Sequence, residues 1–281
     1  VVYADETRWR LMPNKKKGDK PEIKVKGKKK GGSENSRWWT WCVTSEDTAA
    51  YRIFKGRSHK EADKILNGYR GVVMTDGYSA YQTLSKARSE ITLAHCWAHV
   101  RRKFVDAEDA YPELSEHALG LIKKLFLIDR AVPRLTGDAS DEERARILEL
   151  RHKLRQEKSR EIVDELKKWA FETRGAVLPQ SNMGKAINYM LGFWRGLTRF
   201  LGNPRIPLDN NAAERALRGV VVGRKNHYGS RSKRGTEVAA LFYTLFESAK
   251  LSDVDPHRYV LEAAKRAIAN PGTVTLPTDI I

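Results

Sequence analysis

The stretch "GVVMTDGYSAY", residues 71–81, changes from one kind of secondary structure to another. Its first half is a short apolar run that favours a buried strand, and this run ends at Asp76. Gly77 permits a tight turn into the helix that follows. A buried strand that turns directly into a helix is typical of α/β sheets. The stretch therefore predicts an α/β fold with a carboxylate at the end of one strand.

The stretches on either side also alternate between strand and helix patterns. "RWWTWCVTS" (37–45) and "AAYRIFKG" (49–56) are rich in aromatic and β-branched residues, and the short "EDT" between them predicts a hairpin. "SHKEADKILNGY" (58–69) begins with a capping-box pattern, which indicates a helix. "EITLAHCWAHVRRKF" (90–104) predicts a strand that runs into a basic helix, and "VVYADET" (1–7) predicts a buried strand. Together these elements predict an α/β sheet.

A helical block follows this sheet. From Phe104 to about Leu201 the patterns are helical, without a strand signal. They include a long charged segment from its cap at Ser140 to its stop at Gly175. A second amphipathic helix is expected over 183–202.

The rest of the chain returns to mixed patterns, with apolar helices at 236–251 and 255–272 and a loose tail. The expected domains are the first part of the core at 1–104, with a basic loop at 15–36, a helical insertion at 105–200, the second part of the core at 201–250, and a C-terminal helix and tail at 251–281.

The segment "IPLDNNAAERALRG" (206–219) predicts a helix start. Asp209 can act as its N-cap. The helix then has one apolar stripe: Ala213, Ala216, Leu217, Val220 and Val221. Glu214 falls at the edge of this stripe, where core meets solvent, with Asn210 on the inner side. Read locally, Glu214 makes an i,i+4 pair with Arg218 worth about 0.3 kcal/mol.

Composition limits the class of protein. The 281 residues are 41% hydrophobic, enough to bury a substantial core, and the formal net charge of +17 indicates a polyanionic partner or a merely soluble basic protein. Cys42 and Cys96 form neither a disulfide framework nor a four-cysteine metal site. No apolar run is long enough to span a membrane, so a cytoplasmic location is expected.

Basic residues are dense after the helix start. The residues between 215 and 234 include no acid, and the basic ones are Arg215, Arg218, Arg224, Lys225, Arg231, Lys233 and Arg234. We expect them to follow DNA phosphates, which gives affinity without sequence readout, although a solvated loop would have the same composition. Arg218 can either orient Glu214 or contact a phosphate. The lysine-rich stretch 15–30 fits phosphate contact and a solvated spacer equally well.

Three acids stand in related settings. Asp5 is expected at the end of the first strand, Asp76 at the end of a later strand, and Glu214 on a helix after the insertion. Each alone is a weak signal, because acids are common at strand ends. Carboxylates that converge at the strand ends of an open α/β sheet can nevertheless hold hard cations.

Six motifs in order resemble the DDE transposases of the insertion-sequence sixty-six type, whose catalytic domain is ribonuclease H-like. They are "ADET" (4–7), "TDGY" (75–78), "AHCWAHVRRKF" (94–104), "LDNNAAERALR" (208–218), "VVVGRKN" (220–226) and "ESAKLSDVDPHRYV" (247–260). The resemblance implies that Asp5, Asp76 and Glu214 are the metal-binding triad. It also implies a ribonuclease H-like mixed sheet flanked by helices, with the large all-helical insertion before the catalytic glutamate.

The chain departs from this family in two respects. Against the family pattern, we expect it to lack the N-terminal DNA-binding and zinc-containing region of full-length members, and its abrupt start in a strand leads us to expect that a preceding segment has been removed. Its lysine loop is also longer and more basic than the family pattern.

The resemblance implies metal-dependent DNA cleavage and strand transfer at the ends of a mobile element. Water is the first nucleophile and a DNA 3′ hydroxyl the second. Two Mg²⁺ ions, or Mn²⁺, would be held by Asp5 as the bridging ligand, Asp76 on one ion and Glu214 on the other. The expected partners are transposon-end and target DNA, a second copy of the chain, and accessory proteins from the same element.

"HCWAH" (95–99) poses a separate question. His95, Cys96 and His99 lack a fourth zinc ligand nearby, which argues against zinc. By resemblance, His99 helps to position DNA or a proton and is a candidate catalytic residue, while a packed histidine is the alternative.

Aromatic residues pose a similar choice between packing and base contacts. Trp38, Trp39 and Trp41 could stack bases, but core packing is favoured for the group because alternation along a strand buries at least one of them. Trp194 and Phe200 are expected to pack on an amphipathic helix.

Two other functions remain open from the sequence. One is a ribonuclease H-like nuclease that cuts without joining, and insertion of pre-cut ends into a target plasmid would distinguish it. The other is a catalytically inactive DNA-binding remnant of a transposase, which would bind DNA without carboxylate-dependent cleavage.

Overall fold

The computed structural model describes residues 1–12, 38–133, 135 and 139–280. The lysine-rich loop predicted at 15–36 lies outside these residues. The chain divides into two compact units, the first formed by Val1–Tyr3 and Tyr69–Asn211 and the second by Ala4–Gly68 and Ala212–Ile281. The bounds of these units differ from the predicted domain boundaries, and the predicted domains stay a prediction.

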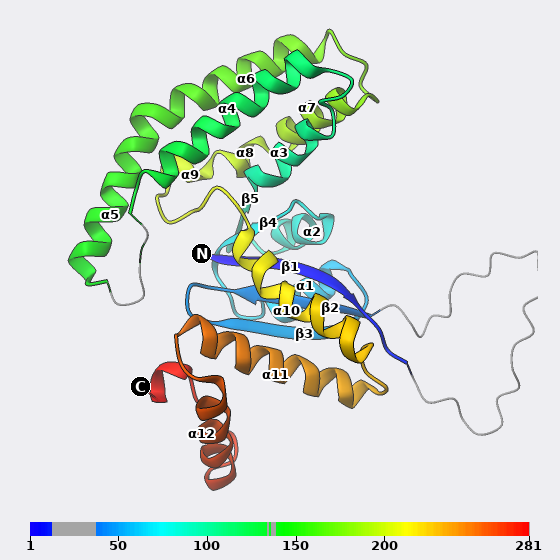
Figure 1. Ribbon diagram of the computed structural model, residues 1–281, viewed down its shortest axis with the longest axis vertical. Coiled ribbons are helices and arrows are strands. Elements are labelled where there is room, and N and C mark those ends of the chain that lie inside the picture. Colours follow the sequence, from blue (N-terminus) through cyan, green and yellow to red (C-terminus); the bar gives the residue numbers. More distant parts are fainter. Residues whose placement is uncertain (13–37, 134, 136–138, 281) are drawn as a thin grey trace, which may run out of the picture. The chain divides into compact units, whose positions relative to one another are not determined.

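The strands form one mixed sheet, ordered β3-β2-β1-β4-β5 (Figure 1). Their bounds are β1 (Val2–Trp9), β2 (Trp38–Thr44), β3 (Ala49–Lys55), β4 (Gly71–Thr75) and β5 (Ile91–His95). β4 pairs in parallel with both β1 and β5, whereas β2 and β3 are antiparallel. The predicted α/β class and the predicted hairpin are both confirmed.

The helices of the first unit include two that precede the predicted helical block, within 79–105, and those of the block itself, which confirm it. They are α2 (Ser79–Ala87), α3 (Trp97–Val105), α4 (Pro112–Arg130), α5 (Asp141–Leu154), the π-helical turn η2 (Arg155–Ser159), α6 (Arg160–Arg174), α7 (Asn182–Gly192), α8 (Trp194–Leu197) and α9 (Arg199–Gly202). The Ser140 side chain accepts a hydrogen bond from the Glu143 N–H, and α6 ends at Gly175, as predicted. Trp97, Phe104, Ile122 and other apolar residues of these helices form a continuous buried core.

The single helix predicted over 183–202 is wrong, because the chain breaks there into α7, α8 and α9. The break brings the short helix α8 against β5. A β-carbon on Gly196 would lie 1.9 Å from Nδ1 of His95, so the chain can pass this strand end only without a side chain at that position. Trp194 packs partly buried and Phe200 fully buried against the core, as expected.

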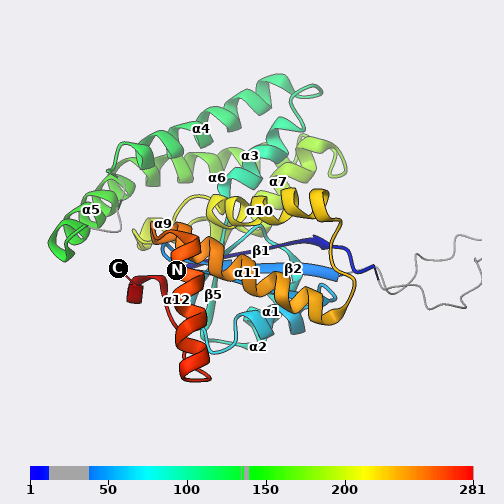
Figure 2. The ribbon, with the colours of Figure 1, turned by 60° about the horizontal axis from the view of Figure 1, so that its bottom comes forward.

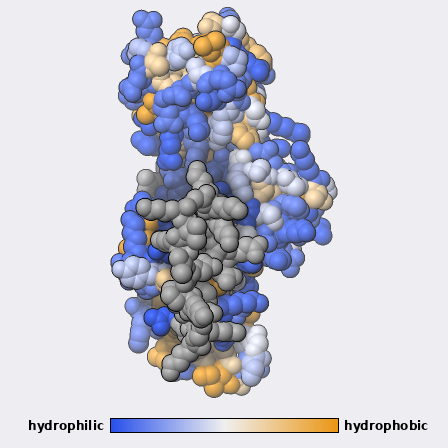
Figure 3. All heavy atoms as spheres, turned by 90° about the vertical axis from the view of Figure 1, so that its right-hand side faces the viewer, coloured by the Kyte–Doolittle hydropathy of each residue, from blue (hydrophilic) through white to orange (hydrophobic). Residues whose placement is uncertain are grey.

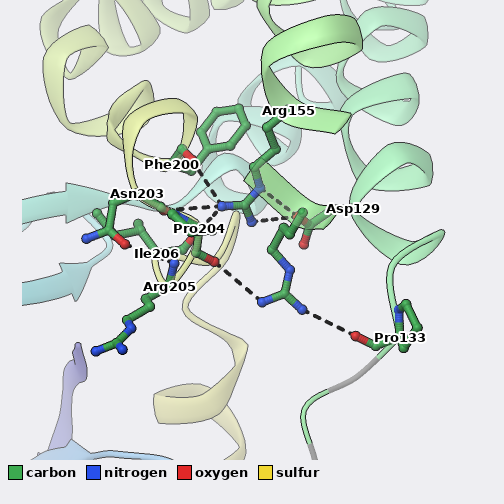
Figure 4. Close-up of polar contacts among 9 residues, drawn as sticks. Asp129, Pro133, Arg155, Phe200, Asn203, Pro204, Arg205 and Ile206 are labelled. Carbon is green, nitrogen blue, oxygen red and sulfur yellow. Dashed lines mark hydrogen bonds and ion pairs between the residues drawn. The ribbon is translucent and has the colours of Figure 1, made fainter. Parts of the chain in front are cut away.

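Arg155 connects the long helix formed by α5, η2 and α6 to the turn that leads toward α10 (Asn211–His227), as Figure 4 shows. Its side chain is almost completely buried and binds Asp129 through Nε at 3.0 Å and Nη2 at 2.5 Å. Nη1 donates to the carbonyls of Phe200 at 3.0 Å and Ile206 at 2.9 Å. A buried guanidinium is tolerated only when its donors are satisfied, and here they hold the turn in place.

The helices of the second unit are α1 (His59–Ile65), α10 (Asn211–His227), α11 (Lys233–Leu251), α12 (Pro256–Ala269) and the 3-10 turn η3 (Pro277–Ile280). The Ser58 capping box at the start of α1 is present, as predicted. The stripe predicted on α10 is buried at Ala213, Ala216, Leu217 and Val220 and half-buried at Val221. It packs with Trp9, Tyr51 and other residues of β1 to β3.

Helix α11 lies along β3, the edge strand of the sheet (Figure 1), and Figure 2 shows this helix from another side. Thr244 Oγ1 accepts a hydrogen bond from the Tyr51 N–H at 2.9 Å. Ser248 Oγ accepts from the Ala49 N–H at 3.1 Å and donates to the Ala49 carbonyl at 3.0 Å. The helix therefore satisfies backbone groups that an edge strand would otherwise leave open to pairing with another chain.

The predicted loose tail is wrong for the described residues up to 280. Tyr259 Oη donates to the Thr275 carbonyl at 2.8 Å, and Arg258 Nη2 donates to the Ile280 carbonyl at 3.0 Å. Ile280 is buried against Tyr259, so hydrophobic contact and hydrogen bonds together return the tail to α12.

Candidate functional site

Asp76 follows β4 directly and is half-buried. Its Oδ1 accepts a hydrogen bond from the Tyr78 N–H at 2.9 Å, and its carbonyl accepts one from Tyr189 Oη at 2.5 Å. Gly77 has φ +94°, and a β-carbon there would lie 2.8 Å from the Phe193 ring. The predicted tight turn therefore requires a glycine at this position, both because of its backbone conformation and because a side chain would not fit. Helix α7 of the helical block thus holds the backbone that carries this carboxylate.

His95 lies beside this site in the same unit, because Thr75 and His95 are register partners at the ends of β4 and β5. It is 8% exposed, and its ring packs against Phe193 with the ring centroids 4.5 Å apart. Burial lowers the pKa of His95, the Asp76 carboxylate opposes this shift, the charge on Arg199 adds to it, and the resulting pKa is about 4. The imidazole is therefore neutral at pH 7. From the sequence, His95 was considered only as a zinc ligand. Its place next to the Asp76 turn follows from the parallel register of β4 and β5.

Cys96 and His99 lie at the start of α3. Cys96 is buried, which raises the pKa of its thiol to about 11, and its Sγ accepts a hydrogen bond from the Asn210 N–H at 3.3 Å. The Trp97 N–H donates to the Leu208 carbonyl at 2.8 Å. This turn therefore holds the segment that precedes α10, and Cys96 has a packing role. His99 is half-buried, and its assignment as a catalytic residue stays a prediction.

Asp209 caps the start of α10, as predicted. Its Oδ1 accepts from the Asn211 N–H at 3.1 Å, and its Oδ2 accepts from Asn211 Nδ2 at 2.8 Å. Because α10 begins at Asn211, the cap acts from two residues before the first helical residue. Asn210 is completely buried, as its predicted inner position requires.

Asp5 and Glu214 belong to the second unit. Asp5 is half-buried in the middle of β1 and accepts a hydrogen bond from the Glu6 N–H at 2.7 Å. Its predicted position at the end of the strand is wrong, because buried Glu6 and Trp9 continue β1 beyond it. Glu214 stands half-buried in the first turn of α10, at the boundary between core and solvent as predicted.

The three predicted metal ligands are thus divided between the units, with Asp76 in the first and Asp5 and Glu214 in the second. Among the described residues of either unit alone, no group of three His, Cys, Asp or Glu side chains could hold a metal ion.

The predicted DNA-binding residues lie on α10, in the loop that follows it and at the start of α11. All of them are exposed except Arg224, which is half-buried. Arg224 Nη1 donates to Thr7 Oγ1 at 2.9 Å and to the Arg8 carbonyl, so it ties α10 to β1. Arg234 also lies 3.8 Å from Glu237, an exposed pair that contributes little stability. Hydrophilic side chains dominate the face drawn in Figure 3, apart from the grey atoms.

A pocket of about 1070 Å³ opens in the second unit. It is lined by Arg8, Trp9, Arg10, Leu11, Met12, Trp38, Trp39, Arg224, Lys225 and Tyr228, and we call it the aromatic-basic pocket. Sequence reasoning named Arg224 and Lys225 for DNA and favoured core packing for the tryptophans. Trp41 is indeed fully buried, whereas Trp38 and Trp39 are half-buried. The alternation of Arg8 and Arg10 along the first strand could have indicated a basic face.

Comparisons with known proteins agree on one family. Residues 1–238 match the model of the family described as "Transposase IS66 family". The uncharacterized protein y4jD of Sinorhizobium fredii is 31% identical over 97% of this chain and 51% of its own length. The uncharacterized protein y4hP of the same organism is 32% identical over 91% of this chain and 48% of its own length. The chain thus spans about half the length of these curated relatives. No solved structure matches.

Among the described helices, none combines the length and the apolar composition that a membrane span needs.

Proposed function

We propose, from the premise that this chain belongs to the IS66 transposase family, that it carries out DNA strand cleavage and strand transfer at the ends of an insertion sequence. Family membership itself supports a transposase-related role. The observation that carries the catalytic proposal is the setting of Asp76. The Tyr78 N–H bonds to this half-buried carboxylate, and the Tyr189 hydroxyl bonds to the Asp76 carbonyl and so holds the backbone that carries it at the strand end, where ligands of α/β sheets bind.

We further propose that the core is ribonuclease H-like. The mixed sheet flanked by helices supports this, as does the large helical segment that precedes Glu214 in the chain. The function is argued from the site, because one fold can host many activities.

The residues present fit divalent cations. Asp5, Asp76 and Glu214 are half-buried carboxylates, and oxygen ligands of this kind suit Mg²⁺ or Mn²⁺. We propose that Asp5, Asp76 and Glu214 would hold two such ions, Asp5 as the ligand shared by both, Asp76 as a ligand of one and Glu214 as a ligand of the other. Such a pair, when bound, activates the attacking oxygen and neutralises charge at the phosphorus.

The chain's own residues would prepare this site. The Asp76 turn and the Tyr189 hydroxyl restrict one carboxylate, and the first turn of α10 restricts Glu214. The exposed arginines and lysines of α10 and of the start of α11 would hold the DNA backbone. His99 is proposed to position DNA or a proton. A DNA complex would contain more than one copy of the chain. Accessory proteins of the element are proposed as further partners.

The test is a strand-cleavage assay on transposon-end DNA with Mg²⁺. We expect Asp5→Asn, Asp76→Asn and Glu214→Gln each to abolish cleavage and retain DNA binding, because an amide cannot replace a carboxylate on a cation. Glu116→Gln, which changes an exposed acid on α4, is the matched control and should cleave normally. Unchanged cleavage by the three variants would refute the assignment. Insertion of pre-cut ends into a target plasmid then separates a transposase from a nuclease that does not join.

A further inference from the structure

We propose that the aromatic-basic pocket of the second unit binds unpaired nucleotides of a DNA strand, with bases against its rings and phosphates against its cations. The choice of DNA rests on the proposed function, whereas the preference for unpaired nucleotides rests on the pocket. The proposal concerns a binding site separate from the three carboxylates.

The composition of the pocket indicates a ligand that is both anionic and aromatic. Its described lining contains three arginines besides Lys225, and it includes no acid. Tyr228 is 62% exposed, and Arg8, Arg10 and Lys225 are also exposed. One exposed ring, two half-buried tryptophans and cations with no acid in the described lining form the combination used for single-stranded nucleic acids.

Hydrogen bonds hold the walls of the pocket in place. Beyond β1 the chain forms a bridge between Leu11 and Ser230, where the Met12 N–H donates to the Ser230 carbonyl at 2.7 Å and the Ser230 N–H donates to the Arg10 carbonyl at 3.0 Å. Trp9 Nε1 also donates to Ser230 Oγ at 3.2 Å. These contacts fasten the loop after α10 to the strand that carries the arginines, so the pocket is preformed in this unit.

Tyr228 adopts a backbone conformation that is unfavourable for its side chain, with φ 61°. Non-glycine residues in this region other than Asn and Asp are uncommon, and such a conformation costs about 1 kcal/mol or more. The next residue, Gly229, has φ 108°, and a β-carbon there would lie 2.2 Å from the Arg10 carbonyl oxygen. The bridge to Arg10 thus fixes the turn, which presents the Tyr228 ring to solvent at the pocket.

The Trp39 ring, also part of the pocket lining, lies close to two arginine side chains. The guanidinium of Arg57 lies 4.6 Å from its ring centroid and that of Arg8 lies 5.7 Å away. Arg57 is paired with buried Glu6, its Nε 2.6 Å from Oε1. Arg8 is therefore the exposed cation of this stack, and its planar guanidinium can contact either a phosphate or a base face.

Competing ligands fit less well. In a double helix the bases are stacked on each other and their faces are not available to protein rings, so a closed duplex would use only the cations of the pocket. The carboxylates of an acidic peptide could pair with the arginines and Lys225 of the pocket, but they would not stack on its aromatic rings. Unpaired nucleotides match both features, since every base has a face that stacks on an aromatic ring.

The experiment compares binding of a labelled oligothymidylate and of a blunt duplex by fluorescence anisotropy, in EDTA, with the whole chain. Tyr228→Asn removes the ring and suits the left-handed backbone, and Tyr228→Phe keeps the ring. We expect Tyr228→Asn to weaken oligothymidylate binding about tenfold, to change duplex binding less than about twofold, and Tyr228→Phe to bind like the unmodified chain.

Controls separate this proposal from the catalytic one. Phe171→Ala removes an exposed ring in the first unit and should leave both affinities unchanged. Equal loss of both affinities in Tyr228→Asn, no loss in either, or displacement of the oligothymidylate by polyglutamate as readily as by unlabelled oligothymidylate would overturn the proposal. Because EDTA excludes metal-dependent cleavage, this result is independent of the carboxylate variants. Failure of those variants to abolish cleavage would refute only the catalytic assignment.

Discussion

His95 shows how burial sets the charge of a single residue. Its pKa is lowered from 6.5 to about 4, so between these values the unfolded chain binds more protons than the folded chain. The contribution of His95 to stability is therefore fully present above pH 6.5, the pKa in the unfolded chain. It is lost as the pH falls toward about 4, the pKa in the folded chain. We predict that the free energy of unfolding attributable to His95 decreases by about 2 kcal/mol from about pH 7 to about pH 5.

Urea unfolding in EDTA at the two pH values measures this effect. His95→Asn removes the titrating ring, and its stability should vary less with pH than that of the unmodified chain. The difference between the two slopes isolates His95 from other groups that titrate in this range, such as surface carboxylates. Identical slopes would show that the imidazole is protonated as readily in the folded chain as in the unfolded one.

At the scale of elements, Arg155 links the π-helical turn η2 to the turn before α10. Replacing it with methionine leaves Asp129 and the carbonyls of Phe200 and Ile206 without their donor. Because the Asp129 side chain is 25% exposed and can be partly rehydrated, we predict a loss near the lower end of the range for broken buried pairs, about 3 kcal/mol.

The matched control is Arg160→Met on the same long helix, where the guanidinium is exposed and bonds to Gln156. Its free energy of unfolding should change by less than about 0.5 kcal/mol. Hydrogen exchange of the amides at 203–209 provides a second measurement, and we expect it to accelerate only in the Arg155 variant. Equal destabilisation by both substitutions would contradict a specific role for the buried arginine.

At the scale of the whole molecule, the net charge of +17 predicts binding to DNA that weakens steeply with salt. Removing one phosphate contact should lower the slope of log affinity against log salt by about 1, and we predict this for Arg231→Gln. Lys265→Gln on α12 removes the same charge from a lysine that bonds to Glu262 and should leave the slope unchanged. Equal changes in both variants would mean that net charge alone determines the affinity.

Much of the fold was predictable because its signals are local. The hairpin, the capping box at Ser58, the turn at Gly77 and the buried stripe of α10 each depend on residues that are neighbours in the chain. The errors arose where distant residues intervene. The helix over 183–202 breaks at its contact with β5, and the C-terminal tail is held by α12.

Periodicity, capping and charge are properties of short stretches, so the amino-acid sequence was enough to predict the α/β class, the helical block, the cap at Asp209 and the basic character of the chain. The folded chain was needed to learn that His95 lies next to the Asp76 turn, that Arg155 is buried, and that Tyr228 shares a pocket with Arg8. These arrangements depend on strand register and on packing between segments far apart in the chain. No local pattern encodes such contacts, because their free energy exists only once both partners are folded.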